Sequence, residues 1–223
     1  MQFIIPTKVN PYPQKPSDTL NPNLVDWVIF DIGNLLFRID HTHAWEQTIR
    51  HTTLPLDEAM RRFQSYGAVV DALIGKIDDE TFFKSFADLI DFTAPADLLA
   101  SFWNPVYQPF PDRLELLEKV LKSFNTGLLS NITSFHSRYL EQRYPLLRKI
   151  PVRIYSWETG FVKPRPEIFE AAIRLCQSPP ERILFVDDHP GHTEAASELG
   201  FQILRVSPDD SLPSLLSCLI QTE

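Results

Sequence analysis

Residues that can do chemistry occur at four separate places in this chain. They are Asp31, then Ser130 with Asn131, then Lys163, and finally Asp187 with Asp188. A carboxylate can act as a nucleophile, and hydroxyl and amide groups can hold an oxyanion. Further carboxylates are ligands for a hard divalent cation such as Mg²⁺. Together the four places offer a nucleophile, contacts for an oxyanion, one cation and a candidate metal site.

Three of these places follow short apolar runs that predict buried strands. Asp31 ends the run that begins at Leu24, which only Asp26 interrupts, and Gly33 behind it frees the backbone to turn. Residues 126–131 and 182–188 repeat the pattern. Because the carboxyl ends of parallel strands meet at one edge of a sheet, we expect these side chains to converge. Taken alone, Asp31 has a second interpretation, in which it only caps the turn.

The elements around these strands predict the fold class. Strands at about 152–155 and 202–206, with helices at about 134–147, 167–175, 194–199 and 212–220, give an alternating pattern. Such alternation predicts an α/β fold with a doubly wound, Rossmann-like parallel sheet. The connection from residue 31 to residue 126 is much longer than one crossover helix requires. It therefore predicts an inserted helical module.

This organisation divides the chain into three parts. Residues 1–23 are a proline-rich leader, residues 24–39 and 109–223 form the core, and residues 40–108 form a helical cap. The aromatic residues of the cap are expected mostly in its own core. They are Trp45, Phe63, Phe82, Phe83, Phe86 and Trp103.

Composition limits the partners. The 223 residues carry a net charge of −8, which argues against nucleic acid or an anionic membrane surface as the main partner. No apolar run has the length of a signal peptide or a membrane span, so we expect a cytoplasmic protein. It is expected to be a monomer or a small homo-oligomer. Cys176 and Cys218 lack metal-ligand spacing and are expected as buried core thiols.

Four motifs in this order resemble the haloacid dehalogenase-like hydrolase superfamily, over about residues 25–206. The motifs are Phe30-Asp31-Ile32-Gly33-Asn34-Leu35, Leu128-Leu129-Ser130-Asn131, Gly160-Phe161-Val162-Lys163-Pro164 and Phe185-Val186-Asp187-Asp188. The Asp-x-Gly-Asn form of the first motif is similar to a subgroup that includes bacterial α-D-glucose-1-phosphate phosphatases. So are Gly75-Lys76-Ile77 and Phe102-Trp103-Asn104.

The resemblance implies a phosphatase acting on a small phosphorylated metabolite, with a sugar phosphate favoured. In that family's terms, Asp31 attacks phosphorus and forms an aspartyl-phosphate. Ser130 and the region of Asn131 hold the phosphoryl oxygens. Lys163 neutralises charge on the nucleophile and on the transferred group.

The resemblance also implies Mg²⁺ as the cofactor. Asp31, Asp188 and the backbone carbonyl of Gly33 would bind the ion. Asp187 belongs to the same site, where it would orient Lys163 or a metal-bound water. The chemistry needs these groups because a phosphoryl group and a carboxylate repel each other until cations offset their charge.

Two positions depart from the family pattern. Gly33 stands where most of these phosphatases have a second Asp, and that acid–base role is typically worth ~10²–10⁴-fold in rate. The loss is consistent with a less basic leaving group, such as that of a sugar-1-phosphate or an acyl phosphate. Asp40 either replaces the acid or caps the first cap helix. His192 stands where Asp or Asn is usual and either bonds the metal shell or lies exposed, as we expect for His189.

Two other functions remain open from the sequence. A catalytically silent family member, serving as a binding or regulatory protein, is consistent with Gly33 and His192. A 2-haloacid dehalogenase also uses an Asp nucleophile without the second Asp. Its chemistry has no need of a metal, and the paired Asp187 and Asp188 argue against it.

Overall fold

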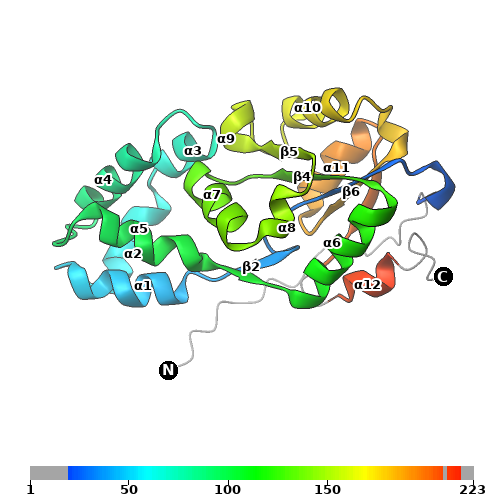
Figure 1. The fold of residues 1–223 in the computed structure, drawn as a ribbon. Coiled ribbons are helices and arrows are strands. Elements are labelled where there is room, and N and C mark those ends of the chain that lie inside the picture. The colour runs from blue at the N-terminus through cyan, green and yellow to red at the C-terminus, as the bar shows by residue number, and fades with distance from the viewer. Residues whose placement is uncertain (1–19, 208–209, 217–223) are drawn as a thin grey trace.

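A five-stranded parallel sheet forms the centre of the computed structural model, which describes residues 20–207 and 210–216 (Figure 1). In spatial order its strands are β5 (Val152–Tyr155), β4 (Asn125–Ser130), β1 (Trp27–Phe30), β6 (Ile183–Asp187) and β7 (Gln202–Arg205). Phe30, the last residue of β1, pairs with Leu128 on one side and Val186 on the other. The residue that follows it therefore emerges between the ends of β4 and β6.

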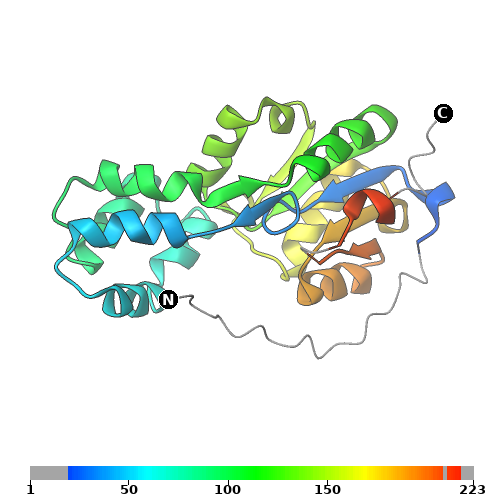
Figure 2. The same ribbon diagram turned by 90° about the horizontal axis from the view of Figure 1, so that it is seen from below.

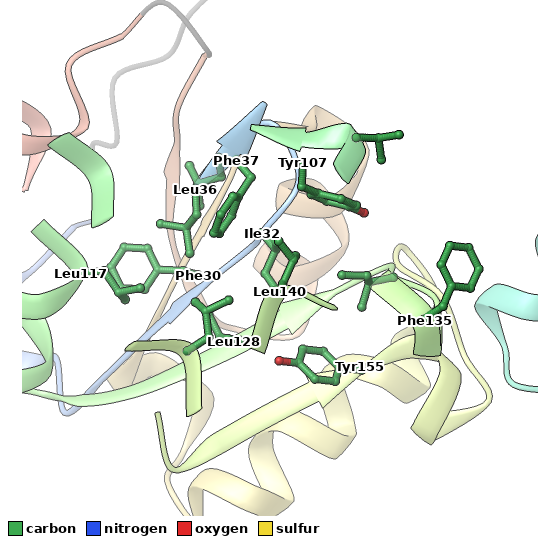
Figure 3. Close-up of a cluster of buried hydrophobic side chains, with 14 of the residues drawn as sticks. Phe30, Ile32, Leu36, Phe37, Tyr107, Leu117, Leu128, Phe135, Leu140 and Tyr155 are labelled. Carbon is green, nitrogen blue, oxygen red and sulfur yellow. The ribbon is translucent and has the colours of Figure 1, made fainter. Parts of the chain in front are cut away.

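Helices cover both faces of the sheet, which confirms the predicted fold class. One face carries α6 (Pro111–Ser123), α7 (Ser134–Arg143), α8 (Pro145–Arg148) and α12 (Leu212–Leu215). The other carries α10 (Pro166–Cys176) and α11 (Pro190–Glu198). Alternate strand residues serve the two faces: Phe30 packs with Leu117 and Leu140 (Figure 3), whereas Ile29 packs with Phe169. The short helix α9 (Ser156–Thr159) follows β5.

Five helices between two short strands form a helical module at one end of the molecule (Figure 2). They are α1 (Thr42–Thr48), α2 (Leu56–Gln64), α3 (Ala68–Leu73), α4 (Asp79–Leu89) and α5 (Ala96–Trp103). The flanking strands β2 (Phe37–Ile39) and β3 (Tyr107–Pro109) pair antiparallel. The sequence predicted the helices but not this pair, because three residues are too few to show a strand period.

Aromatic side chains fill the module, as expected from the sequence. Trp45, Phe86 and Trp103 are buried and make edge-on contacts, with ring centroids 5.0–6.2 Å apart. The module also packs against the core, because the Phe135 ring of α7 lies 4.8 Å from that of Phe83. A hydrogen bond of 3.0 Å joins Nε2 of His136 to the carbonyl oxygen of Trp103.

Several element boundaries differ from the prediction. The helix predicted over 134–147 is two helices, since Pro145 cannot continue the backbone hydrogen bonds of the first. Short 3₁₀ turns at Pro22–Leu24, Ile49–His51, Asn104–Val106 and Pro180–Arg182 complete the chain. Cys176 is buried as predicted. Cys218, most of the leader and the end of the last predicted helix lie outside the described residues. Within the described part, no helix is both long and apolar enough to cross a membrane.

Candidate active site

Asp31 lies at the carboxyl end of β1, where the sequence placed it. Its backbone N–H donates to the carbonyl oxygen of Val186 at 2.9 Å, which continues the sheet pairing by one residue. The residue is 6% exposed. Burial raises the pKa of this carboxyl, and the nearby ammonium of Lys163 opposes that rise.

Lys163 lies between two buried carboxylates. Its Nζ is 2.9 Å from Oδ1 of Asp31 and 2.7 Å from Oδ2 of Asp187, and it donates to the carbonyl oxygen of Leu129 at 3.1 Å. The Lys163 side chain is fully buried. The two carboxylates raise the pKa of Lys163 against the lowering effect of burial. Lys163 is therefore a fixed positive charge beside the candidate nucleophile.

Asn131, the residue directly after β4, holds this lysine in place. The amide Nδ2 of Asn131 donates to the carbonyl oxygen of Lys163 at 2.9 Å, and the backbone N–H of Lys163 donates to Oδ1 of Asn131 at 2.7 Å. Ser130, the last residue of β4, is 2% exposed. The amide of Asn131 thus fixes the backbone of the loop that carries the cation.

Asp187 is engaged on both oxygens. Oδ2 faces Lys163, and Oδ1 accepts from the backbone N–H of His189 at 2.7 Å and lies 3.1 Å from Nδ1 of His192. Burial raises the pKa of Asp187, but Lys163 and His192 outweigh it and lower the value to about 2. His192 therefore contacts the first residue of the acidic pair, Asp187. The side chain of His189 is exposed, as the sequence predicted.

The donor set fits a divalent cation. One carboxylate oxygen from each of Asp31, Asp187 and Asp188 lies within 4.8 Å of the others. Oδ1 of Asp31 is buried and has no hydrogen-bond partner, although it lies close to Nζ of Lys163. Burial and the other two carboxylates raise the pKa of Asp188 to about 7. The three carboxyl groups outnumber the one ammonium, and oxygen ligands are those that Mg²⁺ prefers.

The loop after Asp31 turns at a different residue from the one predicted. Asn34 has a φ of 54°, whereas Gly33 does not adopt a positive φ. The side chain of Asn34 accepts from the backbone N–H of Ile39 at 3.3 Å, and asparagine tolerates the left-handed region through such local bonds. The expectation that Gly33 provides the turn is therefore wrong.

Arg113 supports this loop from α6, a role that was not predicted from the sequence. Its guanidinium donates to the carbonyl oxygen of Leu35 at 2.8 Å and to those of Ser207 and Asp210 at 3.2 and 3.0 Å. The residue is 2% exposed. The signal was present, because residue 113 lies on the same helical stripe as the buried Leu117 and Val120 of α6.

Asp40 lies at the start of the first cap helix, α1. Its Oδ1 accepts from the backbone N–H of Thr42 at 2.9 Å, at the start of α1. These hydrogen bonds lower the pKa of Asp40. Its side chain is exposed. Asp40 thus binds the first backbone N–H of α1 from the position before the N-cap residue, His41, which favours the capping interpretation over the catalytic one.

Comparison with known proteins identifies the family. Residues 25–200 match the model of the haloacid dehalogenase-like hydrolases, and the chain belongs to this family of hydrolases. A D-ribitol-5-phosphate phosphatase of Bacteroides thetaiotaomicron is 25% identical over 182 residues, which cover 78% of this chain and 88% of the relative. A phosphatase of Mycobacterium tuberculosis is 28% identical, covering 78% and 84%. These relatives confirm the prediction of a phosphoric monoester hydrolase.

Solved structures confirm the fold. A haloacid dehalogenase family enzyme from Bacteroides thetaiotaomicron, in complex with magnesium and inorganic phosphate, superimposes with a TM-score of 0.77. It is 21% identical, over 86% of this chain and 98% of that one. The L-2-haloacid dehalogenase of Xanthobacter autotrophicus gives a TM-score of 0.60 at 19% identity, over 86% and 81%. Both share the arrangement of sheet and helices described above.

Proposed function

We propose that this chain is a Mg²⁺-dependent phosphatase of a small phosphorylated metabolite, with a sugar or sugar-alcohol phosphate favoured. The observation that carries the proposal is the position of Asp31, buried at a strand end and 2.9 Å from the ammonium of Lys163. An anionic nucleophile beside a fixed cation suits an anionic electrophile. The ribitol phosphate activity named for one relative supports the substrate class.

Each site residue has a role in this proposal. Asp31 attacks phosphorus, and Lys163 offsets the charge that accumulates between the two anions. The hydroxyl of Ser130 and the region of Asn131 would hold the phosphoryl oxygens. The Asn131 amide also positions Lys163, and Asp187 holds the ammonium from its other side. Each of these groups acts through preorganised charge or hydrogen bonding.

The metal site in this proposal consists of Asp31, Asp188 and the backbone carbonyl of Gly33, with Asp187 beside it. Asp188 has no ion-pair partner among the described residues, whereas both oxygens of Asp187 are engaged. We therefore assign Asp188 as the direct ligand and Asp187 as the support for Lys163. Bound Mg²⁺ would offset the repulsion between the phosphate and the carboxylates.

The helical module acts as a cap in this proposal, with residues 40–108 as its limits. It is inserted between β2 and β3, directly after the loop that follows Asp31, and it packs on α7 through Phe83 and Trp103. A module in this position roofs the strand ends and restricts the site to small substrates. Its opening and closing would then contribute to the turnover rate.

The test is phosphate release from a panel of sugar phosphates and sugar-alcohol phosphates, with and without Mg²⁺. The panel includes glucose-1-phosphate, ribitol-5-phosphate and an acyl phosphate, and Asp31→Asn is the matched control. Release that requires both Mg²⁺ and Asp31 supports the proposal. No release from a folded protein that binds Mg²⁺ would favour the silent binding protein instead. Release of chloride from 2-chloropropionate without metal would favour the dehalogenase.

A further inference from the structure

Tyr107 is a buried residue whose hydroxyl makes no hydrogen bond within the described part of the chain. The residue is 7% exposed, and the described residues provide no hydrogen-bond partner for its oxygen. Aromatic contacts hold the ring, with centroids 4.9 Å from His136 and 6.5 Å from Phe37. Figure 3 shows the hydroxyl directed away from Phe37. Its oxygen is not among the buried side-chain atoms that lack a partner, so the hydroxyl is open to solvent and can meet a ligand.

The position of Tyr107 relates it to the missing acid at Gly33. A Cβ atom added to Gly33 would lie 2.8 Å from Cδ1 of Ile39, so the Ile39 side chain covers the space where an acid would begin. Ile39 is the direct cross-strand partner of Tyr107 in the β2–β3 pair. Directly opposed residues project to the same face of a two-stranded sheet. Tyr107 therefore lies beside the residue that fills the acid's place.

The electrostatics also relate Tyr107 to the nucleophile. Burial raises the pKa of Tyr107, and the negative charge of Asp31 raises it further. The phenol is thus within the electrostatic reach of the nucleophile. It carries its proton at neutral pH and is available as a hydrogen-bond donor.

We propose that the hydroxyl of Tyr107 supplies the acid–base function that Gly33 lacks. This inference rests on the proposed phosphatase function. In the first step the bond from Asp31 oxygen to phosphorus forms and the ester bond breaks, and the ester oxygen takes the proton of Tyr107. In the second step water attacks the aspartyl-phosphate, its proton returns to the tyrosine oxygen, and free Asp31 and inorganic phosphate result. One water is consumed, one alcohol is released and the enzyme is regenerated.

The test compares Tyr107→Phe on two substrates that differ in their need for a proton. Ribitol-5-phosphate has an alkoxide leaving group, whereas p-nitrophenolate leaves without protonation. We expect kcat/KM of the variant to fall about 10²-fold or more on the alkyl phosphate and by less than about threefold on p-nitrophenyl phosphate. The parameter kcat/KM is used because it reports the steps up to departure of the leaving group. The matched control, Tyr139→Phe on α7, should leave both values unchanged.

An equal loss on the two substrates would show a structural role and overturn the inference, as would no loss on either. A wild-type protein that hydrolyses neither substrate would instead overturn the phosphatase proposal itself. The two failures are therefore distinguishable.

A second variant restores the acid directly. Gly33 has no positive φ, and Cδ1 of Ile39 is a terminal methyl that can rotate away, so Gly33→Asp is sterically accessible. In the double variant with Tyr107→Phe, the alkyl phosphate should regain at least about tenfold in kcat/KM. A double variant that still hydrolyses p-nitrophenyl phosphate but shows no recovery would contradict the replacement of one group by the other.

Discussion

The side-chain amide of Asn131 makes two reciprocal hydrogen bonds with the backbone of Lys163. One runs from the amide to the lysine carbonyl at 2.9 Å, and the other from the lysine N–H to the amide oxygen at 2.7 Å. Asn131, which follows β4, therefore fixes both the backbone N–H and the backbone carbonyl of Lys163. From there Nζ reaches Asp31 and Asp187.

Replacing Asn131 by Ala should impair catalysis more than stability. Without the amide the loop can shift, and a displacement of about 1 Å in a reacting group can cost about 10²-fold in rate. We expect kcat for phosphate release to fall by roughly that factor. Asn125→Ala is the matched control, because Asn125 begins the same strand and only donates to the carbonyl oxygen of Asp26 at an exposed position. Equal rates in the two variants would contradict the positioning role.

Replacing Lys163 by Met should destabilise the protein as well as inactivate it. The change leaves Asp31 and Asp187 buried without their shared cation, and breaking a buried ion pair typically costs about 3–5 kcal/mol. Urea unfolding at neutral pH without Mg²⁺ measures the free energy of unfolding. Lys149→Met, at an exposed position, should change it by less than about 0.5 kcal/mol. Unfolding curves that coincide for the two variants would show that Lys163 is not energetically coupled to the carboxylates.

The sequence predicted the convergence of the site because the strand ends carry it. Asp31 and Asp187 each follow an apolar run, and parallel topology brings such positions together. Lys163 lies in a loop, where no strand or helix period places it, and its role came only from the resemblance to a family. Its contacts with Asn131 depend on atomic positions that no periodicity encodes.

Apolar runs and parallel topology do not predict residues that lie away from the strand ends. Tyr107 belongs to a three-residue strand. It lies near Gly33 only because it pairs with Ile39, which precedes it by 68 positions in the sequence. Arg113 was visible in principle, as a charged residue on an apolar helical stripe. Its place on the apolar face of the helix does not predict which carbonyl groups its guanidinium contacts.

Replacing Arg113 by Lys should weaken the structure and displace the nucleophile loop. The guanidinium serves carbonyl groups of two separate segments, Leu35 in one and Ser207 with Asp210 in the other. An ammonium group has no planar fork and cannot reproduce this geometry. We expect a loss of at least about 2 kcal/mol in the free energy of unfolding, together with a lower kcat. Arg174→Lys, on the exposed face of α10, is the control. A stability equal to that of the control would contradict the bracing role.

His136 joins α7 to the helical module. Nδ1 of its ring lies 3.1 Å from Oγ1 of Thr133, and Nε2 lies 3.0 Å from the carbonyl oxygen of Trp103. A neutral ring satisfies both, accepting from the hydroxyl and donating to the carbonyl. Burial lowers the pKa of His136 to about 3, whereas an unfolded histidine titrates near 6.5.

The folded protein should therefore lose stability as the pH falls below 6.5, because the unfolded chain then binds a proton that the folded chain excludes. The loss amounts to at most about 1.4 kcal/mol per pH unit and continues towards pH 3. His136→Gln removes the titration while keeping an N–H for Trp103. Between pH 7.5 and 5, the wild type should lose about 2 kcal/mol more than this variant in urea unfolding. His43→Gln, at an exposed position of α1, should leave the wild-type pH dependence intact. Parallel stability curves for the wild type and His136→Gln would mean that the buried ring takes up its proton without cost, contrary to its contacts.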